Sequence, residues 1–400
     1  MIVTILLKKG REKMIEIRYG KIVTPTEVLI GYSLYIENGY IVEISKTGTS
    51  KKVADKVINA HERYVMPGFI DIHSDKIEKI VNPRPTAVFD FELGLKEVEK
   101  ELLQQGITTI YHSFAMYNDS ALGNSILRRK ENVLKMSELI DDLHKRNHLI
   151  HHRCHLRIEI DNLEMYHITK DLISRKLINE ISFMDHTPGQ GQYKDLEIYK
   201  KSVDYSGGRT FEDIMNYHKN KEKLTEEQMT ELTELAHNNH LTVASHDDDT
   251  LEKLDMNQRI GVDISEFPIT LEVAKEAKKK GMYTVLGAPN ILLGGSHSGN
   301  VSAAEAIVED CVDILCSDYY PQAMLHSVFI MHHKYGISIP DMVNRVSLNP
   351  AKATHIDKEF GSLEVGKRAD VLIVDEFDGY PVITHVLVDG KTTSRVEYRK

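Results

Sequence analysis

The stretch Met66-Pro67-Gly68-Phe69-Ile70-Asp71-Ile72-His73-Ser74-Asp75 is the part of this 400-residue chain that decides its fold. Its apolar run ends in His73 and Asp75, which are two positions apart and so project from the same side of a strand. Four later strand-like runs also end in an imidazole or a carboxylate. They are Arg157-Ile158-Glu159, Phe183-Met184-Asp185-His186, Ala244-Ser245-His246-Asp247 and Leu315-Cys316-Ser317-Asp318. This recurrence indicates several buried strands whose ends carry residues of one chemical kind.

Helical patterns alternate with strand patterns through the middle of the chain. The predicted strands lie at about 68–73, 107–112, 154–160, 180–185, 241–246, 262–267, 282–287 and 313–318. The predicted helices include 92–105, 125–146, 225–239, 271–280 and 302–310. Eight strands alternating with helices predict an α/β protein, a (β/α)8 TIM-like barrel, which typically needs ~250 residues. Its active site lies at the C-terminal ends of the strands, where every imidazole and carboxylate named above falls.

Both ends of the chain show strand patterns with little helix. Asn38-Gly39 stands between two alternating runs and predicts a hairpin. We therefore expect a small β-sandwich domain built from residues 1–66 and 356–400, flanking a barrel of residues 67–355. Residues 1–13 are interpreted either as part of this domain or as an N-terminal extension from an upstream start codon.

Local signals mark several helix ends. Thr225 and Gln228 stand three positions apart at the start of the 225–239 helix, as in a capping box. Gly106 and Gly281 each follow a predicted helix and precede a strand, which is the usual C-cap position.

The composition is that of an ordinary globular protein, with 41% hydrophobic and 28% charged residues. The formal net charge is −10 and no basic stripe stands out, which argues against nucleic acid as a partner. No apolar stretch reaches the roughly 18–20 residues of a membrane span, so no membrane partner is expected. Three cysteines are too few for a disulfide framework, and a cytoplasmic location is the default expectation. The chain is compatible with a homo-oligomer.

Taken singly, each strand end has a structural interpretation. Asp75 or Asp318 could cap a helix, a histidine could be a hydrogen-bonded core residue, and Glu159 could pair with Arg157 or Arg153. Their conjunction in one barrel instead predicts a hydrolytic metal site, because imidazoles and carboxylates bind divalent zinc, manganese or iron. The predicted metal ligands are His73, Asp75, Glu159, His186, His246 and Asp318.

The predicted roles differ between these residues. His73 and Asp75 would hold one cation, His186 and His246 would hold or share the other, and Glu159 would bridge them. Asp318 would orient the attacking water and take its proton as general base. Asp185, Asp247 and Asp248 are interpreted either as partners of the imidazoles or as ordinary loop carboxylates. The cluster His144, His148, His151, His152 and His155 lacks a clean ligand spacing and is interpreted mostly as surface or strand filler.

Three loops could select a substrate. The run Gly294–Asn300 is rich in Gly and Ser and leads into a helix, so its backbone N–H groups could hold an anion. Gln190 lies in a Gly-containing loop after His186, and Arg84 follows the first strand and could bind a phosphate. Flexible loops and a solvated arginine are the alternatives. The predicted substrate-binding residues are Arg84, Gln190, Gly295, Ser296, His297, Ser298 and Asn300.

The chain resembles the amidohydrolase superfamily through Val65–His73 and through Asn349–Ala353 with Gly361–Asp370. Within it, the chain is similar to the phosphonate-metabolism branch, the PhnM type. The motifs that carry this resemblance are His73-Ser74-Asp75 with Glu78-Lys79, Asn82-Pro83-Arg84-Pro85, Met184-Asp185-His186-Thr187-Pro188-Gly189-Gln190, Ser245-His246-Asp247-Asp248, Gly294-Gly295-Ser296-His297-Ser298-Gly299-Asn300 and Ser317-Asp318-Tyr319-Tyr320-Pro321.

The resemblance implies a small phosphorylated substrate and one or two divalent ions per chain, Zn²⁺ first, with Mn²⁺ or Fe²⁺ as alternatives. It implies hydrolysis of α-D-ribose 1-methylphosphonate 5-triphosphate to the 5-phosphate and pyrophosphate. The superfamily usually has a second His where Asp75 stands, and it usually uses the fifth and sixth strands where our count places His186 and His246 on the fourth and fifth. Competing hypotheses are an amidohydrolase acting on a cyclic amide or as a deaminase, and a barrel without catalytic activity.

Overall fold

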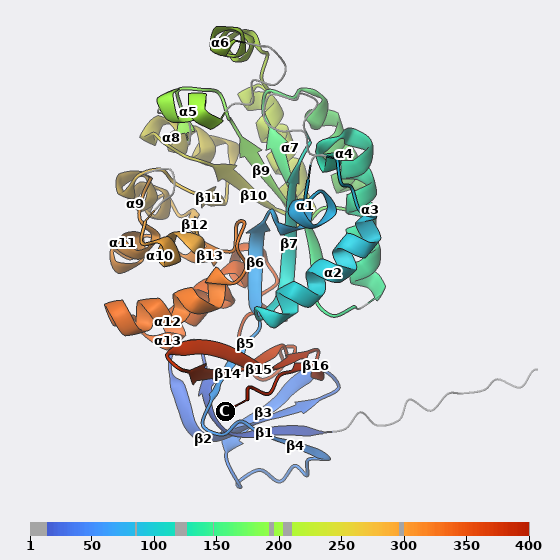
Figure 1. Ribbon diagram of the computed structural model, residues 1–400, viewed down its shortest axis with the longest axis vertical. Helices are drawn as coiled ribbons and strands as arrows, with labels where there is room; N and C mark the ends of the chain where they lie inside the picture. Colours follow the sequence, from blue (N-terminus) through green and yellow to red (C-terminus); the bar gives the residue numbers. More distant parts are fainter. Residues whose placement is uncertain are drawn as a thin grey trace, which may run out of the picture.

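The chain folds into a parallel barrel and a separate mixed sheet (Figure 1). The computed structural model describes residues 14–84, 86–116, 126–146, 148–191, 196–202, 210–295 and 300–399. The fold prediction is confirmed, since all eight strands expected in the middle of the chain form one parallel sheet in sequence order. These strands are β6 Phe69–Ser74, β7 Ile107–Ala115, β8 His151–Glu159, β9 Glu180–Met184, β10 Thr242–His246, β11 Ile264–Glu266, β12 Tyr283–Gly287 and β13 Ile314–Cys316.

The barrel closes between its first and last strands at a single bridge. Ser74 at the end of β6 pairs in parallel with Asp318, two residues beyond β13. The Asp71 carboxylate strengthens this closure, since its Oδ1 accepts from the Ser317 backbone N–H at 3.0 Å. Burial raises the pKa of Asp71 to about 6, against the opposing effect of Ser317. The closure therefore fixes the last strand end against the first.

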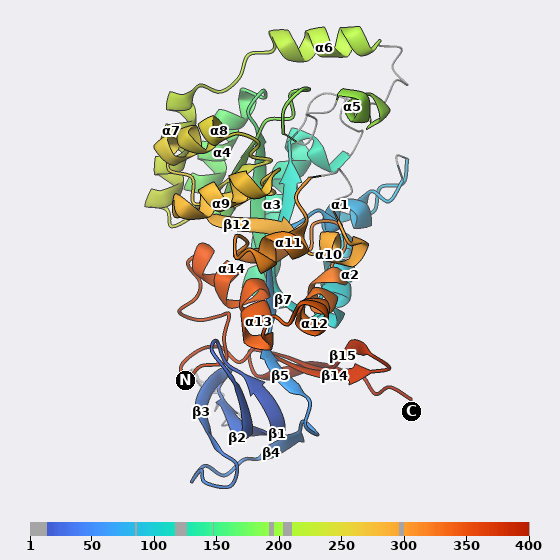
Figure 2. The same ribbon diagram turned by 90° about the vertical axis from the view of Figure 1, so that its left-hand side faces the viewer.

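Most of the described helices pack around the barrel, whereas α6 stands apart at the top of Figure 2. The helices are α1 Lys76–Val81, α2 Phe91–Gln104, α3 Lys130–Arg146, α4 Glu164–Ser174, α5 Leu196–Ser202, α6 Phe211–Asn220, α7 Glu226–Asn238, α8 Leu251–Ile260, α9 Leu271–Lys279, α10 Pro289–Leu293, α11 Ala303–Val308, α12 Ala323–Tyr335, α13 Ile339–Val346 and α14 Leu348–Ala353. The predicted helix 125–146 is split, because a 3₁₀ turn over Ile126–Arg128 precedes α3. None of the described helices is long and apolar enough to cross a membrane.

The predicted helix signals are confirmed. The Thr225 side chain accepts from the Gln228 backbone N–H, and the Gln228 side chain accepts from the Thr225 N–H, which completes the capping box of α7. Gly106 and Gly281 each adopt a φ of +84°, the left-handed conformation that ends a helix and that glycine adopts without strain. Each lets the chain turn directly into the next barrel strand.

The two ends of the chain combine in the second sheet, below the barrel in Figure 1. Its strands are β1 Ile15–Val23, β2 Val28–Glu37, β3 Tyr40–Lys46, β4 Lys56–Asn59, β5 Tyr64–Pro67, β14 Val371–Phe377, β15 Tyr380–Val388 and β16 Lys391–Arg395. The predicted hairpin at Asn38-Gly39 joins β2 to β3, with both residues at positive φ. Strand β5 pairs with β14, so the N-terminal and C-terminal strands form one sheet around an apolar core of their own.

Gly68 lies between β5 of the second sheet and β6 of the barrel, and we expect Gly68→Ala to destabilise the protein. A Cβ at this position would lie 2.1 Å from Thr108 Oγ1, which leaves no room without a backbone shift. The expected loss is about 1–3 kcal/mol of unfolding free energy, as for other overpacked sites. Gly295→Ala is the matched control, because its Cβ would meet nothing within 4 Å. Urea unfolding of both variants tests this, and equal midpoints would contradict the packing argument.

A buried histidine pair links the barrel to helix α2. His112 Nε2 lies 3.0 Å from His152 Nδ1, and His152 Nε2 lies 3.1 Å from Glu99 Oε2. Burial lowers the pKa of His112 well below its usual value, and the neighbouring His152 lowers it further. The folded state therefore holds His112 neutral at a pH where an unfolded histidine takes up a proton.

We expect this pair to make the protein less stable in acid. Stability should fall as the pH decreases below about 6.5, because only the unfolded state gains the His112 proton there. Thermal unfolding followed at pH 7 and pH 5 measures the effect, and His112→Gln should reduce the difference between the two temperatures. The exposed His333 provides the control, since His333→Gln should leave the difference unchanged. An undiminished difference in His112→Gln would exclude His112 as the cause.

Candidate metal centre

A cavity of about 210 Å³ opens at the carboxyl ends of the barrel strands. Four of the predicted metal ligands line it: His73, Asp75, His246 and Asp318. The remaining lining residues are Arg157, Asp247, Phe267, Pro268, Leu286, Gly287, Pro289, Asn290, Asn300, Val301 and Tyr319. Strand ends that are far apart in the sequence thus meet at one mouth.

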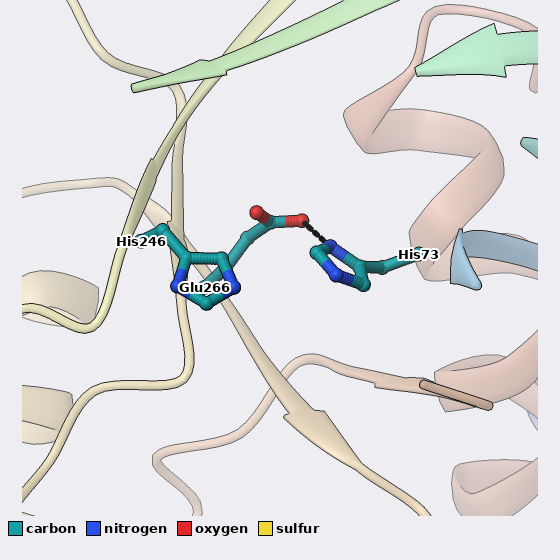
Figure 3. A group of neighbouring side chains, drawn as sticks. All are labelled: His73, His246 and Glu266. Carbon is teal, nitrogen blue, oxygen red and sulfur yellow. Dashed lines mark hydrogen bonds and ion pairs between the residues drawn. The ribbon is translucent and has the colours of Figure 1, made fainter. Parts of the chain in front are cut away.

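His73, His246 and Glu266 form a buried cluster in which the three side chains point toward one another (Figure 3). His73 Nδ1 donates to Glu266 Oε1 at 2.8 Å, and the rings of His73 and His246 have centroids 5.5 Å apart. Burial alone would lower the pKa of His73, but the effect of the Glu266 carboxylate is larger, so the pKa is raised overall. With Nδ1 bound to a carboxylate, Nε2 is the nitrogen left to act as a ligand, which is the usual arrangement of a metal-binding histidine.

A second cluster shares His246 and adds His186 and Asp247. His186 Nδ1 donates to the Glu159 carboxylate, at 2.8 Å from Oε1 and 3.1 Å from Oε2. Burial raises the pKa of Glu159, but His186 opposes this and the pKa is lowered overall. A carboxylate in this position orients an imidazole toward a metal. Glu159 therefore forms its ion pair with His186. The alternative from the sequence, a salt bridge from Glu159 to Arg157 or Arg153, is not formed, although the structure describes all three residues.

The buried polar atoms of the two clusters fit a divalent cation. His246 Nδ1 lies 3.2 Å from Asp247 Oδ2, which is within ion-pair range. Glu266 Oε2 is buried and has no hydrogen-bond partner among the described residues. Such atoms are costly unless a ligand satisfies them. Imidazole nitrogens and carboxylate oxygens are also the donor set that zinc and similar metals bind. The described residues therefore contain groups that could hold a metal ion, with His246 common to both clusters.

Asp75 lies in the cavity wall but pairs with an arginine. Arg157 Nη1 donates to Asp75 Oδ1 at 2.8 Å, and Arg157 Nε donates to Met184 Sδ at 3.0 Å. Burial alone would raise the pKa of Asp75, but the effect of the Arg157 guanidinium is larger, so the pKa is lowered overall. Neither cluster of the described residues includes Asp75. Its predicted role as a metal ligand stays a prediction.

The backbone holds Asp318 against the first strand end. Its N–H donates to His73 O at 3.0 Å, and its carbonyl accepts from the Asp75 N–H at 2.8 Å. Asp318 adopts a φ of +54°, which is uncommon for a residue other than glycine and is concentrated at functional sites. Burial raises the pKa of the Asp318 carboxyl, and the nearby Asp75 raises it further. A carboxylate with a raised pKa is a better proton acceptor.

The predicted substrate-binding residues differ in where they lie relative to the cavity. Asn300 lines the cavity. Arg84 is exposed, and Arg84, Gln190 and Gly295 do not line the cavity. Ser296, His297 and Ser298 lie outside the described residues, so their predicted roles stay predictions.

The neighbouring carboxylates have separate partners. Asp248 accepts from Ser245, Ser265 and Asn257 and so ties β10 to β11. Asp185 accepts from Lys223 Nζ at 2.8 Å and from Thr187. Of Asp185, Asp247 and Asp248, only Asp247 belongs to a candidate metal cluster.

Sequence reasoning missed Glu266 and the position of Arg157. Glu266 ends β11 just as the predicted ligands end their strands, so the same pattern could have found it. Arg157 stands two residues before Glu159, and its spacing gave no sign that it reaches across to Asp75. The histidine cluster that includes His155 was interpreted mostly as surface or strand filler. His155 lies fully buried in β8, with its ring centroid 5.2 Å from that of His73.

A family model and a characterised protein each match most of this chain. A model described as the Amidohydrolase family matches residues 64–393. Alpha-D-ribose 1-methylphosphonate 5-triphosphate diphosphatase of Escherichia coli (strain K12) is 32% identical over 380 residues, which span 93% of this chain and 98% of that protein.

Solved structures with lower sequence identity share the fold. N-acetylglucosamine-6-phosphate deacetylase from Pasteurella multocida is 14% identical, with a TM-score of 0.62 over 95% of this chain and 99% of that one. An adenosine deaminase from Xanthomonas campestris with bound zinc is also 14% identical, with a TM-score of 0.63 over 97% of this chain and 95% of that one. At these identities the likeness concerns the fold alone.

Proposed function

The chain belongs to the amidohydrolase family, and we propose that it is a metal-dependent diphosphatase of phosphonate catabolism. Its substrate is α-D-ribose 1-methylphosphonate 5-triphosphate, and its products are the 5-phosphate and pyrophosphate. The observation that carries this proposal is the similarity to the Escherichia coli diphosphatase over nearly the whole of both chains. The cavity supports it, because His73, His246 and Asp318 meet there beside the cationic Arg157.

His73, His186 and His246 are the proposed imidazole ligands of the metal, with Glu159 and Asp318 as carboxylate ligands. Zn²⁺ is the proposed ion, with Mn²⁺ or Fe²⁺ as alternatives. When bound, a divalent cation lowers the pKa of a coordinated water and neutralises charge on the phosphoryl oxygens. The pair of clusters that share His246 supports the three imidazole ligands. Glu159 and Asp318 belong to neither cluster and are proposed as ligands from the sequence motifs.

The residues of the chain would act on a water and a phosphorus atom. Asp318 accepts the proton of the attacking water as a new P–O bond forms at the α-phosphorus. The bond from this phosphorus to the α,β-bridging oxygen breaks, and the proton passes from Asp318 to the departing pyrophosphate. The raised pKa of Asp318 suits it to both transfers. Positioning and charge neutralisation account for most of the catalysis in such reactions.

Binding of the phosphates is proposed for Asn300, which lines the cavity, and for Arg84, Gln190, Gly295, Ser296, His297 and Ser298. We also propose a cytoplasmic location. The three cysteines are free and buried, as expected in a reducing compartment.

An amidohydrolase or deaminase activity is the second candidate, favoured by the family as a whole. Pyrophosphate release from the triphosphate, measured beside ammonia release from adenine and ring opening of a cyclic amide, separates the two. The proposal predicts pyrophosphate release alone, stopped by a chelator and restored by added Zn²⁺ or Mn²⁺. Ammonia release or ring opening without pyrophosphate would contradict it.

A further inference from the structure

We propose that the Arg157 guanidinium is a built-in cation of the active site that takes the place of a second metal ion by pairing with Asp75. The enzyme then holds one divalent ion per chain, and Arg157 offers a fixed positive charge to the polyphosphate. This inference rests on the proposed function, because it assumes that one metal ion binds. It differs from the sequence-based expectation in removing Asp75 from the metal ligands.

The ion pair between Arg157 and Asp75 is the first observation. The contact joins Nη1 to Oδ1 at 2.8 Å, and the two side chains are 12% and 25% exposed. Asp75 stands where a ligand of a second ion would be expected, two residues beyond His73 on the first strand end. Its charge is already matched by a guanidinium, which carries no lone pair and cannot ligate a metal.

The second observation is the charge that surrounds Arg157. Four carboxylates interact electrostatically with its guanidinium, and they are Asp75, Glu159, Glu266 and Asp318. These carboxylates come from the ends of four strands or the residues just beyond them. A guanidinium stays protonated in proteins, so Arg157 places a fixed positive charge among carboxylates that would otherwise attract two divalent ions. A second divalent ion near Asp75 would be repelled by the guanidinium.

The third observation concerns the hydrogen-bond donors that remain. Nη1 is directed to Asp75 and Nε to Met184 Sδ, while Nη2 has no partner among the described residues. Arg157 lines the cavity, so these remaining donors are available to an anionic ligand there. A planar guanidinium is well suited to phosphate oxygens. Arg157 thus holds Asp75 with one nitrogen and can bind a phosphate with its remaining donors.

Metal counting tests the inference without using activity. The purified protein is loaded with Mn²⁺, dialysed, and measured by inductively coupled plasma mass spectrometry and electron paramagnetic resonance. The expected result is one Mn²⁺ per wild-type chain with an uncoupled spectrum. Asp75→Asn should keep this single ion, because the residue is not a ligand. Arg157→Met should take up a second ion, while Arg157→Lys, which retains the charge, should not.

Arg175→Met is the matched control, because Arg175 is a surface residue paired with Glu138. It should behave as the wild type. Two coupled Mn²⁺ ions in the wild type, reduced to one in Asp75→Asn, would overturn the inference while leaving the proposed function intact. No bound ion in any loaded protein would overturn the proposed function and this inference with it. If Arg157→Met misfolds, the wild-type count and Asp75→Asn still test whether one ion binds and whether Asp75 is a ligand.

Discussion

Replacing Asp318 by Asn is expected to lower kcat by about 10²–10⁴-fold, the usual contribution of a general base. The amide cannot accept the proton of the attacking water, although it keeps the size of the side chain. The backbone bonds from Asp318 to His73 and Asp75 do not involve the carboxylate, so the strand end should keep its conformation. Steady-state kinetics with the triphosphate, together with the thermal unfolding temperature, measure both effects.

Asp313→Asn is the control for this variant. Asp313 lies at the opposite end of the same strand, where its carboxylate accepts from Thr284 at 3.1 Å, and it does not line the cavity. It should retain the wild-type kcat even if its stability falls. If Asp318→Asn also kept the wild-type kcat with a normal metal content, Asp318 would not be the base.

Replacing His246 by Asn is expected to abolish metal binding and, with it, hydrolysis. His246 belongs to both clusters described at the candidate metal centre, so its loss removes a ligand from either of them. The affinity for the ion should fall by more than the roughly 10–100-fold that follows loss of an outer partner of a metal ligand. Titration with Zn²⁺ against a competing chelator measures this affinity directly.

His333→Asn provides the comparison. His333 is 54% exposed on α12, pairs with Glu376 and does not line the cavity. It should bind metal and hydrolyse the substrate as the wild type does. An unchanged Zn²⁺ affinity in His246→Asn would mean that the ion binds elsewhere.

The fold could be predicted because its signals are local. Alternation of strands and helices, the capping box at Thr225 and the turn at Asn38-Gly39 each depend on neighbouring residues. Helices such as α10 and α14 were not predicted, because at five and six residues they are too short to carry a period. The 3₁₀ turn before α3 was also not predicted.

The candidate site could be predicted only in part. His73, His246 and Asp318 meet because each follows an apolar strand, and that pattern is visible in the sequence. The contact between Arg157 and Asp75 depends on the relative position of the first and third barrel strands, which no local pattern encodes. Glu266 resembled the other strand ends, but its strand has only three residues and its role depends on His73 across the barrel.

The central claim is that this barrel releases pyrophosphate from a ribose 5-triphosphate. Phosphorus NMR of the metal-loaded enzyme with α-D-ribose 1-methylphosphonate 5-triphosphate follows every phosphorus atom at once. The account predicts that the triphosphate signals are replaced by one pyrophosphate and one 5-phosphate, with the phosphonate signal unchanged. Release of orthophosphate without pyrophosphate, or an unaltered triphosphate in the presence of bound metal, would contradict it.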